Sequence, residues 1–273
     1  MTKIAKIIIA ILIVGLLFVV FKALAATTPN FGDSSNYAVL SSTYTDTSAA
    51  TTINGSVGFT TPPATAPLGT HTNYGSGAPY SLAGTDQASI VGNLNAQTCN
   101  FNFGSATDLS LLSQPLTPGV YCITGAQSVG TGGITLLAGT YVFRSTGALN
   151  TVANSTVSGG NACDIFWTPV ATTLGENSTF KGTVIDDAGI TVGSTVVWTG
   201  RAFAFGGTIT TDTDTITVPS CVNSIVDTIA TTTTPVTVAR QGGHRRTVAT
   251  STPVVVEVPV IIPSLPNTGF PEY

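Results

Sequence analysis

Few side chains in this sequence have the types and the spacing that catalysis requires. The close carboxylate pairs are Asp186 with Asp187 and Asp212 with Asp214. Neighbouring residues of a strand point to opposite faces, so only Asp212 and Asp214 can share one face. Those two carboxylates suit a weak Ca²⁺ site or, more simply, a solvated turn. Because no nucleophile, histidine and acid are grouped together, we predict no enzyme, no cofactor and no metal site.

The cysteines are the other reactive side chains. Cys99, Cys122, Cys163 and Cys221 are even in number, none forms a CxxC pair, and the chain has two histidines. In an exported protein this pattern favours disulfides over zinc. Four cysteines allow three pairings, and the sequence leaves all three open. We choose the nearest neighbours, Cys99–Cys122 and Cys163–Cys221.

Residues 172–216 repeat themselves with a period of 18. A fixed period with glycines and apolar residues in register indicates one structural unit stacked on itself. The unit is too short for two helices, and its threonines and valines favour strands. We therefore predict a β-solenoid with three strands in each coil. The recurring residues are Gly175, Gly182 and Gly189 as Gly193, Gly200 and Gly207; Phe180 as Trp198 and Ile216; Leu174 as Val192; and Asn177 as Thr195 and Thr213.

Alternation along the predicted strands separates core positions from surface positions. The inward positions carry Leu174, Val192, Phe180, Trp198, Val184 and Ala202. The outward positions carry Thr173, Thr191, Thr179, Lys181, Thr199, Thr215 and Thr217. The solenoid should therefore present flat walls that are rich in threonine.

The composition agrees with a β-structure covered by hydroxyl groups. Charged residues make up 8% of the 273 residues, against about 25% in ordinary domains. The net charge of −4 gives no reason to expect a nucleic-acid partner. Residues 83–97 form the one helix predicted in the mature domain, with Thr85 as its cap and Ala88, Ile90, Val91 and Leu94 as its apolar face.

Both ends of the chain differ from this domain. Residues 1–25 combine Lys3 and Lys6 with an apolar run and Ala23-Leu24-Ala25, which predicts a signal peptide, or alternatively a membrane anchor. Residues 26–35 are a lead-in to the solenoid domain, 36–221. Residues 222–264, rich in Thr, Pro and Val, are predicted to form an extended stalk. The chain is therefore expected to be secreted or displayed on the cell surface.

Residues 265–273 contain a motif that resembles a sorting signal of cell-wall proteins. The motif is Leu265, Pro266, Asn267, Thr268 and Gly269. A sorting signal normally continues into an apolar segment and a basic tail, whereas this chain stops four residues later. The tail and the N-terminal segment are the two parts expected to contact a cell envelope.

Several motifs resemble those of the microbial ice-binding proteins, in the order expected for that family. They are YAVL at 37–40, INGSVG at 53–58, LTPGVYC at 116–122, ACDIFW at 162–167, TLGENSTFKG at 173–182 and GRA at 200–202. The resemblance covers about residues 36–221. It implies a right-handed, three-faced β-solenoid, with coils not stacked in strict sequence order and one α-helix packed along its side.

The resemblance also implies that the partner is an ice crystal surface. Solenoid strands lie about 4.7–4.9 Å apart, close to a repeat of the ice lattice. Threonine supplies a methyl and a hydroxyl on a stiff side chain. We expect a monomeric domain that adsorbs to ice through Thr179, Thr199, Thr215 and Thr217, although Lys181 and Val197 interrupt that face. The other candidate face carries Thr173 and Thr191, followed by Ile209.

Two other classes of function use a β-solenoid. Some parallel β-helices degrade polysaccharides with clustered carboxylates in a groove, which this sequence lacks. A cell-surface adhesin or structural domain, binding a glycan, a cell or another surface with the same fold, is the alternative to ice binding.

Overall fold

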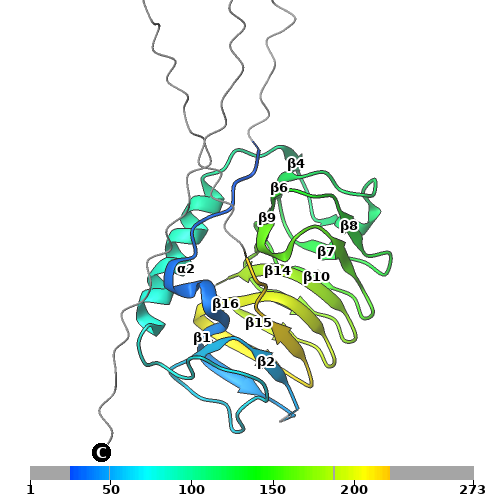
Figure 1. Cartoon of the computed structure of the whole chain (residues 1–273). Coiled ribbons are helices and arrows are strands. Elements are labelled where there is room, and N and C mark those ends of the chain that lie inside the picture. The colour runs from blue at the N-terminus through cyan, green and yellow to red at the C-terminus, as the bar shows by residue number, and fades with distance from the viewer. Residues whose placement is uncertain (1–24, 49, 187, 222–273) are drawn as a thin grey trace, which may run out of the picture. The chain divides into compact units, whose positions relative to one another are not determined.

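The computed structural model describes residues 25–48, 50–186 and 188–221. Residues 1–24 of the predicted signal or anchor (1–25), the stalk and the sorting-like tail lie outside the described residues. Parallel strands wind into a solenoid with three walls, here called faces a, b and c (Figure 1). The predicted fold class, a β-solenoid with one helix at its side, is confirmed.

Each face takes one strand segment from each coil. Face a contains β4 (Phe101–Phe103), β6 (Gly119–Ile123), β9 (Tyr141–Ser145), β12 (Ile165–Thr168), the end of β14 (Thr179–Ile185), the middle of β16 (Val197–Thr211), the start of β1 (Tyr37–Asp46) and β3 (Ser56–Gly58). Face b contains β5 (Thr107–Asp108), β7 (Gln127–Val129), β10 (Leu149–Thr151), β13 (Thr172–Leu174), β15 (Gly189–Val192) and the ends of β16 and β1. Face c contains β8 (Ile134–Leu136), β11 (Val157–Gly159), the starts of β14 and β16, β17 (Thr215–Thr217) and β2 (Thr52–Asn54).

The coils do not stack in sequence order. β1 pairs with β16, and β2 pairs with β17, so the N-terminal coil lies on the last coil. From the N-terminal coil the chain passes along helix α2 (Tyr80–Asn95) to the other end of the solenoid and winds back (Figure 1). Bridges from Thr61, Leu68 and Tyr74 to this coil place residues 60–75 over its outer edge.

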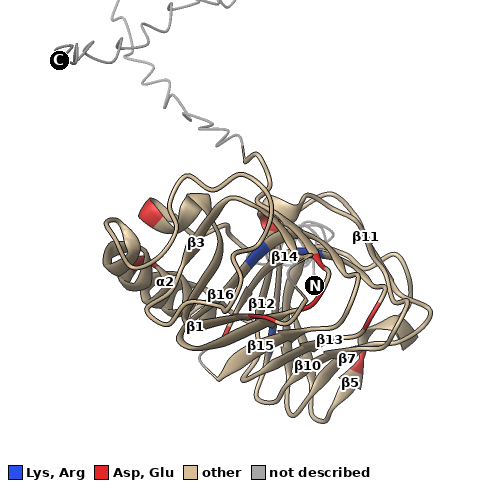
Figure 2. Ribbon diagram, turned by 90° about the horizontal axis from the view of Figure 1, so that it is seen from below, with Lys and Arg blue, Asp and Glu red and all other residues tan. Residues whose placement is uncertain are grey.

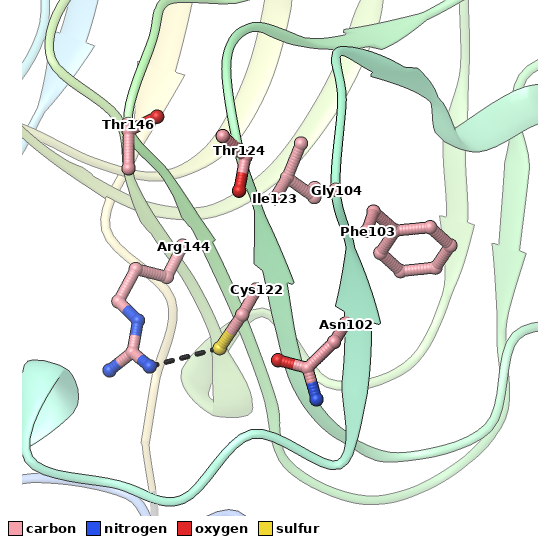
Figure 3. A pocket seen from close by; sticks show the side chains of 8 residues that line it. All are labelled: Asn102, Phe103, Gly104, Cys122, Ile123, Thr124, Arg144 and Thr146. Carbon is pink, nitrogen blue, oxygen red and sulfur yellow. Dashed lines mark hydrogen bonds between the residues drawn. The ribbon is translucent and has the colours of Figure 1, made fainter.

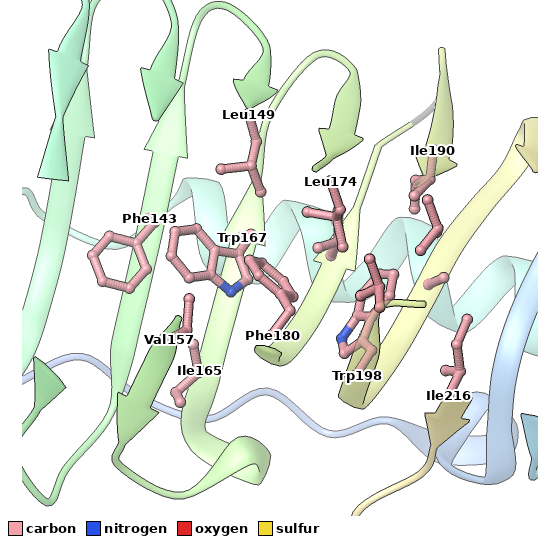
Figure 4. Packing of buried hydrophobic residues seen from close by; sticks show 14 of the residues in the cluster. Phe143, Leu149, Val157, Ile165, Trp167, Leu174, Phe180, Ile190, Trp198 and Ile216 are labelled. Carbon is pink, nitrogen blue, oxygen red and sulfur yellow. The ribbon is translucent and has the colours of Figure 1, made fainter. Parts of the chain in front are cut away.

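One apolar core runs through all the coils. Phe143, Trp167, Phe180 and Trp198 follow one another with ring centroids 4.2, 5.2 and 5.4 Å apart (Figure 4). All six residues predicted to point inward are buried. Dispersion contacts between coils, rather than local propensity, therefore hold these short strands in register.

Helix α2 covers face a and begins three residues before its predicted start. Pro79 precedes it, and Thr85 lies inside it, donating to the Ser81 carbonyl, so the predicted cap is wrong. Ile90 and Leu94 are buried as predicted, whereas Ala88 is exposed. The side of the helix that packs on the solenoid therefore differs from the predicted apolar face. The reason is that Phe205 lies against Gly84, and its ring centroid is 4.9 Å from that of Tyr80.

Three 3₁₀ segments and two disulfides complete the domain. The 3₁₀ segments are Gly32–Asn36, Leu109–Leu111 and Ala162–Asp164. The disulfides join Cys99 to Cys122 and Cys163 to Cys221, which confirms the chosen pairing. The first ties the residues after α2 to β6, and the second ties the end of the described chain to the segment before β12.

A repeated corner explains the recurring polar positions between faces b and c. Asn154, Asn177, Thr195 and Thr213 all have positive φ, between 56° and 63°. Such a conformation is uncommon for β-branched threonine. Stacked backbone bonds support it: the Asn177 N–H donates to the Ser194 carbonyl, and the Thr195 N–H to the Asp212 carbonyl.

Candidate functional site

Faces b and c are the two walls that helix α2 leaves uncovered. On face b, one outward position recurs through seven strands. Strand pairing aligns Asp108, Ser128, Asn150, Thr173, Thr191, Thr210 and Thr45 in a single row. Four consecutive threonines, from Thr173 to Thr45, form the half of this row that lies nearest the N-terminal coil.

The register of face b corrects one prediction from the sequence. Ile209 was expected to interrupt the row after Thr191, but Thr191 pairs with Thr210. Ile209 pairs with Ile190 and is fully buried. The predicted equivalence of Gly189 and Gly207 is wrong for the same reason, because Gly189 pairs with Thr208.

An extra residue in β16 causes this difference. Ile185 pairs with Phe203, a separation of 18 residues, whereas Gly189 pairs with Thr208, a separation of 19. The inserted stretch holds Phe205, which packs on Tyr80 of helix α2. A one-residue change of register exchanges the two sides of a strand, so it turns Thr210 outward and Ile209 inward.

A second outward row of face b is made of smaller side chains. It comprises Ala126, Ala148, Ala171, Gly189, Thr208, Thr43 and Thr61. Both rows are uncharged apart from Asp108 at the end of the solenoid that is farthest from the N-terminal coil. Figure 2 shows how sparsely charged residues are spread over the ribbon, with an acidic one on β5.

Face c has outward rows of a different character. Thr156, Thr179, Val197, Thr215, Thr52 and Leu68 follow one another in one row. Val197 and Leu68 are 52% and 57% exposed. The neighbouring positions include Lys181, Thr199, Thr217 and Asn54. The predicted residues Thr179, Thr199, Thr215 and Thr217 thus lie together on face c, whereas Thr173 and Thr191 lie together on face b.

Hydrogen bonds engage some side chains of face c, although none within the described residues involves the hydroxyls of Thr179, Thr199 and Thr215. On face c, Lys181 donates to the Gly159 carbonyl at 3.2 Å, Thr135 bonds Ser158 at 3.1 Å, and Asn54 donates to Thr217 at 3.4 Å. Within the described residues, the hydroxyls of Thr173, Thr191, Thr210 and Thr45 make no such side-chain bond. Their donors and acceptors are therefore available to water.

A buried polar cluster lies under the corner where faces b and c meet. The Asp214 carboxylate accepts backbone N–H bonds from Val196 and Asp212, at 2.8 and 2.7 Å. Burial raises the pKa of Asp214 to about 6 despite those bonds, and Asp212 and Asp46 add to the shift. Across the seam between the first and last coils, Tyr44 bonds Thr211 at 2.9 Å.

This cluster was the place where the sequence allowed a Ca²⁺ site. Within the described part of the chain, no group of three or more His, Cys, Asp or Glu side chains could hold a metal ion. Both Asp214 oxygens are engaged by backbone amides, so its role in the structure is to hold the corner.

A family model described as ice-binding-like matches residues 39–217. The chain belongs to the ice-binding-like family. No curated protein sequence matches it. Among the described residues, no helix has the length and apolar character needed to cross a membrane.

Solved structures place this ice-binding-like domain among proteins with the same fold. One is an ice-binding protein from an Antarctic biological consortium, with 24% identity and a TM-score of 0.67, covering 73% of this chain and 95% of the other. Another comes from the Antarctic ascomycete Antarctomyces psychrotrophicus, with 22% identity and a TM-score of 0.62, covering 71% and 100%. A third comes from an Antarctic bacterium of the Flavobacteriaceae, with 26% identity and a TM-score of 0.61, covering 73% and 49%. None of these three is described as an adhesin.

Proposed function

We propose that this protein adsorbs to ice through face b and thereby slows crystal growth. The observation that carries the proposal is the unbroken row of Thr173, Thr191, Thr210 and Thr45, in register on four neighbouring strands. The second row beside it holds only alanine, glycine and threonine. Membership in the ice-binding-like family supports the same activity.

The chemistry follows from regular spacing and restricted motion. Strands about 4.7–4.9 Å apart repeat each threonine at an almost constant interval. The β-branched side chain has few rotamers, so little entropy is lost when the surface orders water. Many weak contacts then act together over the flat wall. A charge would hold its own hydration shell and disturb this order. Among the described residues, the two outward rows of face b contain no charge except Asp108 at one end.

The register of the strands changes our preference between the two faces. The sequence favoured Thr179, Thr199, Thr215 and Thr217 on face c. That face includes a lysine, two exposed apolar side chains and hydroxyls that bond one another. Face b loses its expected interruption, because Ile209 is buried. We therefore prefer Thr173 and Thr191, together with Thr210 and Thr45, as the ice-binding row.

A pair of matched substitutions tests this choice. Thr191→Tyr places a bulky ring in the middle of the face b row, and Thr179→Tyr places the same ring on face c. Both threonines are exposed and lie in strands. We expect Thr191→Tyr to lower thermal hysteresis and inhibition of recrystallisation at least tenfold, with Thr179→Tyr close to the wild type. Circular dichroism melts would show that both variants remain folded.

The other outcomes have clear meanings. Loss of activity in Thr179→Tyr alone would move the site to face c. Full activity in both variants would exclude both rows. If the unmodified protein neither facets a single ice crystal nor separates its melting and freezing points, ice binding itself is wrong.

We also propose that the protein works outside the cell. Two disulfides support this, because they persist in oxidising compartments, and residues 1–25 have the pattern of an export signal. The mass of the protein recovered from the producing cells and their medium tests it. A new N-terminus near Ala26 would show cleavage, whereas an intact N-terminus in the membrane fraction would favour the anchor.

A further inference from the structure

A pocket of about 330 Å³ opens on face a, beside β4, β6 and β9. It is lined by backbone and side chains of those strands and of the turns that follow them, and Cys122 and Arg144 lie together at one side (Figure 3). Its volume falls in the range of pockets that admit small molecules. The Cys122 side chain, half-buried, is therefore accessible from this pocket.

Arg144 is the feature that gives this pocket a chemistry. One nitrogen of its guanidinium lies 2.9 Å from both Cys99 Sγ and Cys122 Sγ. The other nitrogen donates to the backbone carbonyls of Asn95, the last residue of helix α2, and of Gln97. All four acceptors are neutral, so the positive charge is held against the disulfide and is not neutralised by these contacts.

A cation beside a sulfur favours the thiolate form, which is the leaving group in thiol–disulfide exchange. Because the guanidinium contacts both sulfurs, it can stabilise whichever sulfur leaves. Access to the attacked sulfur and a stabilised leaving thiolate both speed attack by a small thiol. The pocket supplies access to Cys122, and Arg144 lies against both sulfurs of Cys99–Cys122.

We propose that this pocket is a site of thiol–disulfide exchange, at which a small-molecule thiol attacks the Cys99–Cys122 disulfide. The thiolate of the incoming molecule forms a new S–S bond with Cys122 Sγ. The Cys99–Cys122 bond breaks, and Cys99 leaves as a thiolate beside Arg144. The two electrons of the broken bond stay on Cys99, and the product is a mixed disulfide in the pocket. A second thiol molecule of the same kind completes the reduction.

The second disulfide provides an internal comparison. Cys221 is exposed and Cys163 is buried, so an incoming thiol reaches Cys221 and Cys163 must leave. The nearby guanidinium of Arg201 lies 3.7 Å from Cys221 Sγ, the sulfur that is attacked. Within the described residues, that guanidinium makes no hydrogen bond to the buried Cys163 sulfur, which would leave as the thiolate. This disulfide should therefore react slowly.

Exchange at Cys99 would release helix α2 without touching face b. Cys99 follows the helix by four residues, and Gln97 holds the lead-in through two bonds of 2.9 Å to the Thr27 backbone. Reduction should loosen these attachments, while the core and both outward threonine rows stay in place. The inference is independent of the ligand proposed for face b.

Kinetic reduction of the purified, oxidised protein tests the proposal. The protein is treated with glutathione, quenched with an alkylating agent at set times and analysed by peptide mass spectrometry. We expect Cys99–Cys122 to be reduced about tenfold faster than Cys163–Cys221, as expected when the leaving thiolate is stabilised. A glutathione adduct on Cys122 should precede full reduction.

Three variants separate the parts of the argument. Arg144→Gln should slow reduction of Cys99–Cys122 about fivefold, with Cys163–Cys221 unchanged, and Arg144→Lys should restore most of the rate because it keeps the charge. Thr124 is an exposed residue that lines the pocket. Thr124→Trp should fill the pocket and so slow the reduction of Cys99–Cys122 by glutathione. Equal rates at the two bridges would overturn the proposal. So would faster reduction in Arg144→Gln, because the guanidinium would then be a shield.

Discussion

Faces b and c are consecutive segments of the same coils and share one core, yet their outer rows differ. Thr191 on face b has threonines on both neighbouring strands, whereas Val197 on face c replaces one hydroxyl with a methyl. Face c also includes Lys181, and several of its hydroxyls bond neighbouring side chains. Folding of the solenoid therefore requires both walls to be flat and to consist of residues that favour strands. It does not require either wall to carry a continuous row of uncharged hydroxyls. The row on face b is not explained by folding, which is why we assign it a function.

The largest expected effect concerns the core that both faces share. Trp198 is 1% exposed, packs on Phe180 and donates its indole N–H to the Gly182 carbonyl at 2.8 Å. Trp198→Ala should lower the free energy of unfolding by about 3–5 kcal/mol because it leaves a large cavity. Although Trp198 lies beneath face c, both faces should unfold together. Thermal unfolding should be monitored by circular dichroism and by the fluorescence of a label placed first on one face and then on the other. All of these signals should change in one common transition. Two separate transitions would show that the faces are independent.

A smaller effect is expected at the helix, which touches neither face. A Cβ at Gly84 would lie 2.3 Å from the Phe205 ring, whereas one at Gly92 would meet nothing within 4 Å. Gly84→Ala should therefore destabilise the protein by about 1–3 kcal/mol through overpacking. Gly92→Ala should stabilise it by about 0.5–1 kcal/mol, because alanine is the better helix former. Both variants should keep full activity on ice at 0 °C, and a loss in Gly92→Ala would implicate the helix in ice binding.

The fold could be predicted from the sequence because the repeat records contacts between coils. Phe180, Trp198 and Ile216 recur at 18 residues and do stack on one another. Both disulfides were also predicted correctly. The position of Thr210 could not be predicted in this way, because the extra residue near Phe205 is fixed by packing on helix α2, which lies about 120 positions away in the sequence. A period of 18 continued through that point wrongly places Ile209 outward and Thr210 inward.

The predicted start of the helix was wrong for a related reason. Thr85 has the right residue type for a cap, but the helix starts at Tyr80, whose hydroxyl donates to the Ser41 carbonyl at 2.8 Å. A contact with a distant strand thus extends the helix beyond its local signal. The contrast between faces b and c also needed the structure, since the pairing of strands decides which outward residues are neighbours.

The corner between the two faces should make stability depend on pH. The pKa of Asp214 is raised from 3.8 to about 6, so the folded protein keeps a proton that the unfolded chain loses between those values. Stability contributed by this group is therefore greatest below a pH of about 4 and falls by about 1–2 kcal/mol as the pH rises from there to about 6. Asp214→Asn removes this contribution, so its stability relative to the wild type should improve between pH 4 and pH 7. Chemical denaturation at both pH values measures this, and a constant difference would contradict it.

The smallest effect is expected from an attempt to make face c resemble face b. Val197→Thr makes the residues from Thr156 to Thr52 a continuous threonine row, and Lys181→Thr removes the charge from the neighbouring row. Both positions are at least partly exposed, so stability should change by about 0.5 kcal/mol or less. Activity should rise less than twofold in the wild-type background, because Leu68 remains exposed and the hydroxyls of Thr217 and Thr135 remain bonded to Asn54 and Ser158. The decisive background is Thr191→Tyr, in which face b is blocked. If the double substitution restores thermal hysteresis there, composition alone makes an ice-binding wall. If it does not, an uncharged row of threonines is not sufficient by itself. In the wild-type background, dye-labelled protein should then coat the same crystal planes with and without the two substitutions.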